Sequence, residues 1–278
     1  LEEALQLPEL SSIDETKISL RITKQRVALL TALGDITGQL SLTQVTRFLS
    51  EFAELAIRRA LASLLQAAFD KKQLSSASQE QSGIVILGMG KLGGRELNYS
   101  SDIDLIILYE AEKLPFTGGL SKQHFMTRLA QDLVTILHDR TADGYVFRTD
   151  LRLRPDPAST PPAITMEAAA RYYETVGQNW ERSAMIKARV VGGDIVSGAK
   201  FMQSIQPFIW RRHLDFAAIN DILSIKRQMH APIHGTTITL PGHNIKTGHG
   251  GIREIEFLAH IYQLIWGGRR PSLRLIPT

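Results

Sequence analysis

The sequence predicts a mixed helix-and-sheet fold of the α+β class, in which a small α/β core lies between two helical regions. Two observations lead to this prediction. Apolar residues recur at helical spacing near both ends of the chain. Between these ends, short apolar runs are bounded by glycine and proline, as is typical of buried strands. We therefore divide the 278 residues into an N-terminal helical region (1–80), a core (81–160) and a C-terminal helical region (161–278).

Two helices are predicted in the N-terminal region. Asp14 can cap the first, which would run to about Leu30, and Ser41 can cap a second and longer one. The serine-rich stretch 75–78 then predicts a short linker before the core.

The core is predicted to hold three strands and one helix. The strands are expected over residues 83–88, 102–109 and 145–154, and a glycine-rich turn, 88–94, follows the first. Ser121 can cap the helix, which would end near residue 138.

Helices return in the C-terminal region. They are expected from Thr165 to Tyr173, from Asn179 to Val190, from Asp215 to Met229 and from Ile252 to Trp266, with a loop over 231–251. Four histidines lie in or beside this loop, but they lack a metal-ligand spacing, so we expect no zinc site. They are His230, His234, His243 and His249.

The composition is that of an ordinary soluble protein, with 44% hydrophobic and 22% charged residues. A net charge of +4 and a pI of about 9.3 suit an anionic substrate but do not call for a nucleic-acid partner. The absence of cysteine excludes disulfides and thiol catalysis and is compatible with the cytoplasm. No apolar run is long enough for a membrane helix, and no signal peptide is evident. Because the chain begins with Leu1, we expect it to be part of a longer protein.

The glycine turn matches the GxGxxG dinucleotide fingerprint over residues 88–93, and Glu110 lies near the position of the ribose-binding acid. However, only residues 95–101 separate the turn from the next strand, which is too short for the crossover helix of that fold. The P-loop pattern is also absent, because a leucine follows Lys91. We therefore reject both nucleotide-binding folds.

Two carboxylates open the second predicted strand. Asp102 and Asp104 are two residues apart, so their side chains should share one face of the strand. An isolated pair of this kind is commonly solvent-exposed, but this pair precedes an apolar run that should be buried. Neighbouring carboxylates repel each other and need a cation, and Mg²⁺ is the ion that carboxylates and phosphate oxygens bind together.

A third acid, Asp150, lies on the next predicted strand. Every second residue of this strand is charged and the residues between are mostly apolar, so one face would carry Arg148, Asp150, Arg152 and Arg154. This face could simply be solvated. In the functional interpretation, Asp150 completes the metal site and the arginines neutralise phosphate charge. Three acids of this kind are typical of a two-metal phosphoryl- or nucleotidyl-transfer site.

The glycine turn would supply the phosphate cradle of such a site. We expect the backbone N–H groups of Gly93 and Gly94, together with the Ser101 hydroxyl, to bind phosphate oxygens.

The combination of Leu92-Gly93-Gly94, Asp102-x-Asp104-Leu105 and a later Asp150 resembles the nucleotidyltransferase superfamily of polymerase-beta type. Longer strings resemble bacterial glutamine synthetase adenylyltransferase, the bifunctional adenylyl-transferring and adenylyl-removing enzyme. They span residues 90–105, 150–155, 180–189 and 250–257 and occur in the order of that family.

This resemblance implies a function. The family enzyme has two related halves, and the N-terminal half removes AMP from a tyrosine of glutamine synthetase by Mg²⁺-dependent phosphorolysis, which releases ADP. The segments 180–189 and 251–257 resemble that half more closely. The implied partners are glutamine synthetase, phosphate, an adenine nucleotide and, through the full-length enzyme, the signal protein PII.

The resemblance also assigns residues. Asp102, Asp104 and Asp150 would hold Mg²⁺ and carry catalysis. The phosphate- or substrate-binding residues would include Lys91, Arg152, Arg154 and Lys187. For Lys187 and for Arg189, whose phosphate or substrate contact was weighed with it, a position on a surface helix is the competing interpretation.

Two other functions stay open from the sequence. One is the adenylylating half, which would consume ATP and release pyrophosphate. The other is a non-catalytic module that binds a nucleotide or a partner without turnover.

Overall fold

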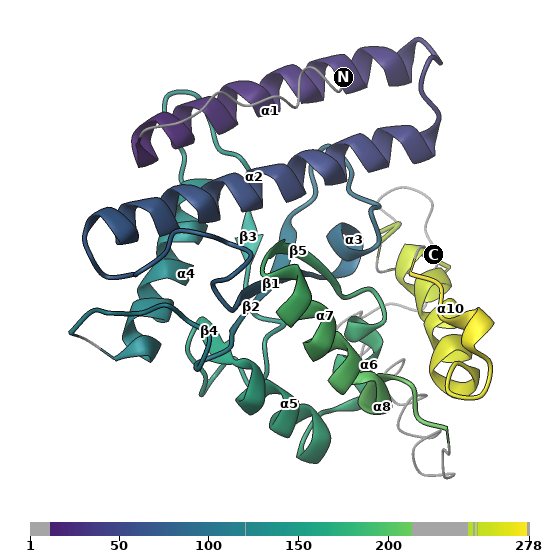
Figure 1. The fold of residues 1–278 in the computed structure, drawn as a ribbon. Coiled ribbons are helices and arrows are strands. Elements are labelled where there is room, and N and C mark those ends of the chain that lie inside the picture. Colours follow the sequence, from purple (N-terminus) through teal and green to yellow (C-terminus); the bar gives the residue numbers. More distant parts are fainter. Residues whose placement is uncertain (1–11, 120, 213–243, 247, 249, 277–278) are drawn as a thin grey trace.

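The computed structural model describes residues 12–119, 121–212, 244–246, 248 and 250–276. Two long helices, α1 (Ile13–Ile36) and α2 (Leu42–Asp70), pack side by side (Figure 1). Ser41 begins α2 as expected, through a capping box with Gln44. The cap of α1 is Ser12 and not Asp14, because the Ser12 hydroxyl accepts a hydrogen bond from the Glu15 amide. The helix also runs past Leu30 to Ile36.

A five-stranded mixed sheet lies at the centre. Its strands are β1 (Ile84–Gly88), β2 (Ile103–Tyr109), β3 (Thr149–Asp150), β4 (Ala163–Thr165) and β5 (Arg189–Gly193). The order is β3-β2-β1-β5, and β4 also pairs with β2. β1 is antiparallel to β2 and to β5, whereas β3 and β4 run parallel to β2. Because β1 and β2 are antiparallel, they do not form the parallel βαβ unit of the dinucleotide fold, which confirms its rejection.

Helices cover both faces of the sheet, so β1 and β2 are buried on both sides. One face packs on α1, α2 and α4 (Lys122–His138), which Ser121 caps as predicted. The opposite face packs on a second group of helices, and α10 lies at the edge of this group (Figure 1). The group comprises α5 (Met166–Thr175), α6 (Asn179–Met185), α7 (Ile195–Ser204), α8 (Gln206–Ile209) and α10 (Ile252–Trp266).

The prediction of a third strand over residues 145–154 is mostly wrong. Only Thr149–Asp150 pairs as a strand, because the chain turns immediately after Asp150. The Asp150 carboxylate accepts a hydrogen bond from the Arg152 amide at 2.8 Å, which closes this turn. The face of four alternating charged residues therefore does not form.

The expected helix over 179–190 is also too long. It ends at Met185, and the chain then enters β5 beside β1. The C-terminal region 161–278 thus supplies two strands of the sheet, β4 and β5. The expected helix 215–229 and the four loop histidines lie outside the described residues.

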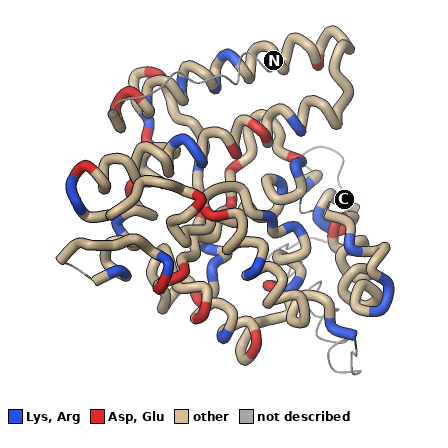
Figure 2. Tube along the Cα trace, in the orientation of Figure 1, with Lys and Arg blue, Asp and Glu red and all other residues tan. Residues whose placement is uncertain are grey.

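Charged residues are scattered over the fold, with basic and acidic positions interspersed (Figure 2). This distribution agrees with a small net charge of +4. In the described part of the chain, every helix is too short or too polar to cross a membrane.

Candidate functional site

The parallel pairing of β2 with β3 brings the three predicted carboxylates to one place. Asp104 and Asp150 are register partners on these neighbouring strands, and Asp102 lies directly before β2. Paired residues of adjacent strands are about 5 Å apart and point to the same face. The Ile103 amide, which donates to the Arg148 carbonyl at 2.9 Å, extends this pairing to the start of β2.

The surroundings of the Asp104 carboxyl disfavour its charged form. Its pKa is raised above the ordinary value, first by burial and then by the negative charges of Asp150 and Asp102. Arg152 and Lys246 oppose this rise. The three carboxylates are therefore close enough to repel one another, which is the condition that a bound cation would relieve.

Arginines hold the other two carboxylates. Arg148 forms a short ion pair with Asp102, and Arg152 donates to both oxygens of Asp150 at 2.6–3.0 Å. Hydrogen bonding from Arg152 is the main reason that the pKa of Asp150 is lowered. Arg152 is itself 84% exposed, so a bound anion could reach it.

A divalent metal fits the chemistry of these donors but not their present orientation. Among the described residues, no group of three or more His, Asp or Glu side chains is gathered closely enough to hold a metal ion. Two of the three carboxylates are turned toward Arg148 and Arg152, as described above. Carboxylate oxygens are the ligands that Mg²⁺ prefers. Arg152 engages both oxygens of Asp150 and would have to release them before that carboxylate could bind a metal, whereas Arg148 donates to the Oδ1 atom of Asp102.

The glycine turn lies against Asp104. It forms the short helix α3 (Gly90–Gly93), and the Met89 amide donates to the Asp104 carbonyl at 2.9 Å. Gly90 has φ +52°, a conformation that glycine adopts without strain. A Cβ atom at Gly90 would lie 3.5 Å from the Asp104 Oδ2 atom. The turn thus sets the position of this carboxylate.

The predicted phosphate cradle is not formed by the expected groups. The Gly93 amide donates to the Met89 carbonyl and the Gly94 amide to the Gly90 carbonyl, so both are occupied within the turn. The Ser101 hydroxyl is engaged by Asn98, to which it donates at 2.8 Å. These groups close local turns in this structure, which corrects their assignment as free phosphate donors.

The structure separates the predicted basic residues. Lys91 lies on α3, in the turn beside the carboxylates. Arg154 instead donates to the carbonyl groups of Leu151, Pro157 and Thr160 and so organises the loop after β3. Burial lowers its pKa. Its predicted contact with phosphate has no support in this geometry.

Lys187 lies neither on a surface helix nor in the open site. It precedes β5, its side chain is only 5% exposed, and its ammonium group is 2.7 Å from the Glu96 carboxylate. The contact with Glu96, the second residue after the glycine turn, could not be predicted from the sequence because 91 positions separate the two residues.

Two further residues lie near the site, although neither was among the predicted site residues. Arg189 donates to the carbonyl groups of Leu92 and Gly93, and so binds the C-terminal end of α3. Lys246 affects the pKa of Asp104 from the loop before α10. A sequence signal existed for Arg189, since it lies in one of the family strings, but none distinguished Lys246.

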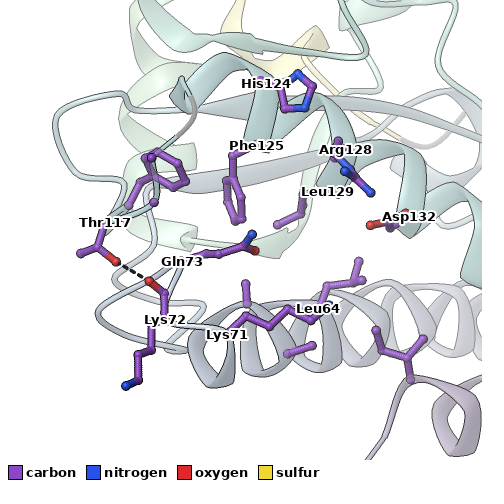
Figure 3. Close-up of a pocket in the computed structure, with 16 residues that line it drawn as sticks. Leu64, Lys71, Lys72, Gln73, Thr117, His124, Phe125, Arg128, Leu129 and Asp132 are labelled. Atoms are coloured by element: carbon purple, nitrogen blue, oxygen red, sulfur yellow. Dashed lines mark hydrogen bonds between the residues drawn. The ribbon is translucent and has the colours of Figure 1, made fainter.

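A cavity of about 560 Å³ lies elsewhere, between the C-terminal end of α2 and α4 (Figure 3). Phe125 and Leu129 on α4 contribute apolar walls, and Gln73 and Arg128 contribute polar groups. None of the predicted site residues lines this cavity. It is therefore separate from the carboxylate site.

Comparison with known proteins identifies the family of this chain. The profile of the glutamate-ammonia ligase adenylyltransferase family matches residues 2–204. The profile of the PII-uridylyltransferase family matches residues 223–275.

Curated relatives are similar over nearly the whole chain. A bifunctional glutamine synthetase adenylyltransferase/adenylyl-removing enzyme of Rhizobium meliloti is 51% identical over 268 residues, which is 95% of this chain and 27% of the relative. Enzymes of the same name from Agrobacterium fabrum and Caulobacter vibrioides are 50% and 51% identical, covering 95% and 92% of this chain and 27% and 26% of the relatives. The chain thus spans about a quarter of their length. On this evidence, the chain belongs to the glutamate-ammonia ligase adenylyltransferase family.

Proposed function

We propose that this chain is the adenylyl-removing unit of a longer bifunctional enzyme. It takes AMP from an adenylylated tyrosine of glutamine synthetase, transfers it to inorganic phosphate and releases ADP. The observation that carries the proposal is the meeting of Asp102, Asp104 and Asp150 at the β2–β3 edge beside the glycine turn. The names of the relatives supply the reaction pair, adenylyl transfer and adenylyl removal.

The reaction is a displacement at one phosphorus atom. An oxygen of inorganic phosphate forms a bond to the AMP phosphorus, and the bond from that phosphorus to the tyrosine oxygen breaks. The tyrosine oxygen leaves with the bonding electron pair. Because a phenol has a pKa of about 10, it is a fairly good leaving group, and we assign no general acid.

The carboxylates would hold Mg²⁺, which supplies positive charge to polarise phosphate oxygens and to offset charge on the leaving oxygen. Arg148 and Arg152, which neutralise Asp102 and Asp150 here, are placed to turn toward substrate phosphate instead. Lys91, on the glycine turn, would be a further basic residue for phosphate.

The removing reaction is preferred over the adding one because of two segments. Residues 180–189 and 251–257 resemble the removing half of the family. The second candidate is therefore the adenylylating half, which would consume ATP. We also propose that the enzyme works in the cytoplasm and that PII acts through the full-length protein.

Product identity tests this proposal. The chain is incubated with adenylylated glutamine synthetase, Mg²⁺ and phosphate, and ADP is measured. We expect ADP from the wild type, a loss of activity in the double variant Asp102→Asn/Asp104→Asn, and normal activity in Asp132→Asn, an acid on α4 away from the site. In a parallel incubation with unmodified glutamine synthetase, Mg²⁺ and ATP, release of pyrophosphate by a chain that forms no ADP in the first incubation would support the adenylylating half. Full activity in the double variant would refute the assignment of the carboxylates.

A further inference from the structure

Lys187 connects three separate elements through its ammonium group. The Nζ atom lies 2.7 Å from the Glu96 carboxylate, which follows the glycine turn, and 3.5 Å from the Glu256 carboxylate on α10. The lysine side chain is 5% exposed, whereas the two glutamates are about one-third exposed or less. A charge this deeply buried is tolerated because its partners compensate it.

The backbone of Lys187 also contacts the glycine turn. A Cβ atom at Gly93 would lie 1.7 Å from the Lys187 carbonyl oxygen, so the two backbones are in direct contact. Two residues later, Arg189 donates to the carbonyl groups of Leu92 and Gly93, each at 3.0 Å. Its guanidinium is anchored in turn by Glu54 on α2 at 2.6 Å. Residues 187–189 thus hold the turn by ion pairing, backbone packing and carbonyl binding.

This glycine turn also positions Asp104. The Met89 amide, at the start of the turn, donates to the Asp104 carbonyl, and Gly90 packs beside the Asp104 carboxylate. A shift of the turn would therefore move a carboxylate of the candidate site. Displacements of about 1 Å can reduce catalysis by about 100-fold.

We propose that Lys187 is a positioning residue that fixes the glycine turn beside Asp104, and that it is not a phosphate ligand. This inference rests on the proposed function for its kinetic consequence. Two carboxylates already surround the ammonium group, so an approaching phosphate would meet negative charge as well as positive. The buried ion pairs instead fit a structural link between the turn and α10.

Kinetic measurements separate the two roles. We expect Lys187→Met to lower kcat by about 10-fold or more while the KM for phosphate changes less than about two-fold, and Lys187→Arg to recover most of the loss. Glu96→Gln should resemble Lys187→Met, because it breaks the same link. If Lys187 binds phosphate, Lys187→Met will instead raise the KM for phosphate, and Glu96→Gln will lower it by removing a repelling charge. That pattern would overturn the proposal.

Lys113→Met is the matched control. Lys113 also forms a close ion pair with a buried acid, Asp194, at 2.5 Å, but it lies at the opposite end of the sheet from the turn. We expect this variant to keep the wild-type kcat.

Hydrogen exchange tests the positioning role independently of the reaction. In the wild type, the Gly93 and Gly94 amides are hydrogen-bonded within the turn. We expect both to exchange at least about 10-fold faster in Lys187→Met or Glu96→Gln than in Lys113→Met. Unchanged exchange would overturn the proposal, even for an active enzyme. If the wild type releases no ADP, the proposed function fails, and the exchange result still decides whether Lys187 fixes the turn.

Discussion

A single methyl group at Gly93 should disrupt the candidate site. In Gly93→Ala, the new Cβ atom would lie 1.7 Å from the Lys187 carbonyl oxygen and 2.7 Å from the Gly88 carbonyl oxygen. Contacts of Cβ atoms below 3.0 Å essentially do not occur, so relief of the closer contact alone requires a movement of 3.0 − 1.7 = 1.3 Å. Both obstacles are backbone atoms, and no change of side-chain rotamer can remove them.

The steric clash in Gly93→Ala should lower both the stability and the activity of the protein. Overpacking of this kind destabilises a protein by about 1–3 kcal/mol, which corresponds to a fall in Tm of about 2–12 °C for a chain of this size. A movement of about 1 Å next to Asp104 should lower the rate of AMP removal by about 100-fold. Thermal unfolding and ADP release, measured on the same preparation, give the two numbers.

The control is Gly119→Ala, because a Cβ atom at that position meets no atom within 4 Å. We expect it to match the wild type in Tm and activity. If Gly93→Ala also matched the wild type in both, the close contact between the turn and residue 187 would be refuted.

Three further changes test the buried charges and the carboxylate site. Burial raises the pKa of Glu181 above the ordinary 4.5, so stability is greatest while the group is protonated and is lost as pH rises through the folded-state pKa. The Tm of the wild type relative to Glu181→Gln should fall as pH rises above about 4.5, and a constant difference would contradict this. Burial also lowers the pKa of Arg182 to about 10, and this side chain donates to the carbonyl groups of Phe208 and Ile209. We expect Arg182→Met to reduce the free energy of unfolding by about 3 kcal/mol or more in denaturant titration, and a change below about 1 kcal/mol would be too small for this role. Finally, Mg²⁺ should raise the Tm of the wild type but not of Asp104→Asn, whereas equal shifts would place the metal elsewhere.

Local signals predicted much of the fold. Serine caps and helical spacing located α2 and α4, and the apolar runs located β1 and β2. Rejection of the dinucleotide fold also needed only the short spacer after the turn, and the antiparallel pairing of β1 with β2 confirmed it.

Long-range pairing explains what was missed. β5 forms beside β1, about one hundred positions earlier in the chain, and this ends the helix that the sequence extends to Val190. The signal was Val190-Val191 followed by two glycines, of which Gly193 has φ +82°. The strand 145–154 failed for a local reason, because Asp150 binds the Arg152 amide and turns the chain.

The placement of the acidic residues at one site could be predicted from the sequence, but the contacts of the basic residues could not. The spacing of Asp102 and Asp104 identified one strand, and parallel pairing then placed Asp150 beside them. The basic residues near the acids have several possible partners, which spacing cannot distinguish. Thus Arg154 organises a loop and Lys187 joins two buried ion pairs, although both had been expected at phosphate.

Labelled phosphate gives the most direct test of the central claim, which is transfer of AMP to inorganic phosphate at the carboxylate site. The chain is incubated with adenylylated glutamine synthetase, Mg²⁺ and radiolabelled phosphate, and the products are separated. We predict that the label appears in ADP with the wild type and is lost with Asp104→Asn. Release of free AMP with no label in ADP, or labelled ADP formed equally well by Asp104→Asn, would contradict the claim.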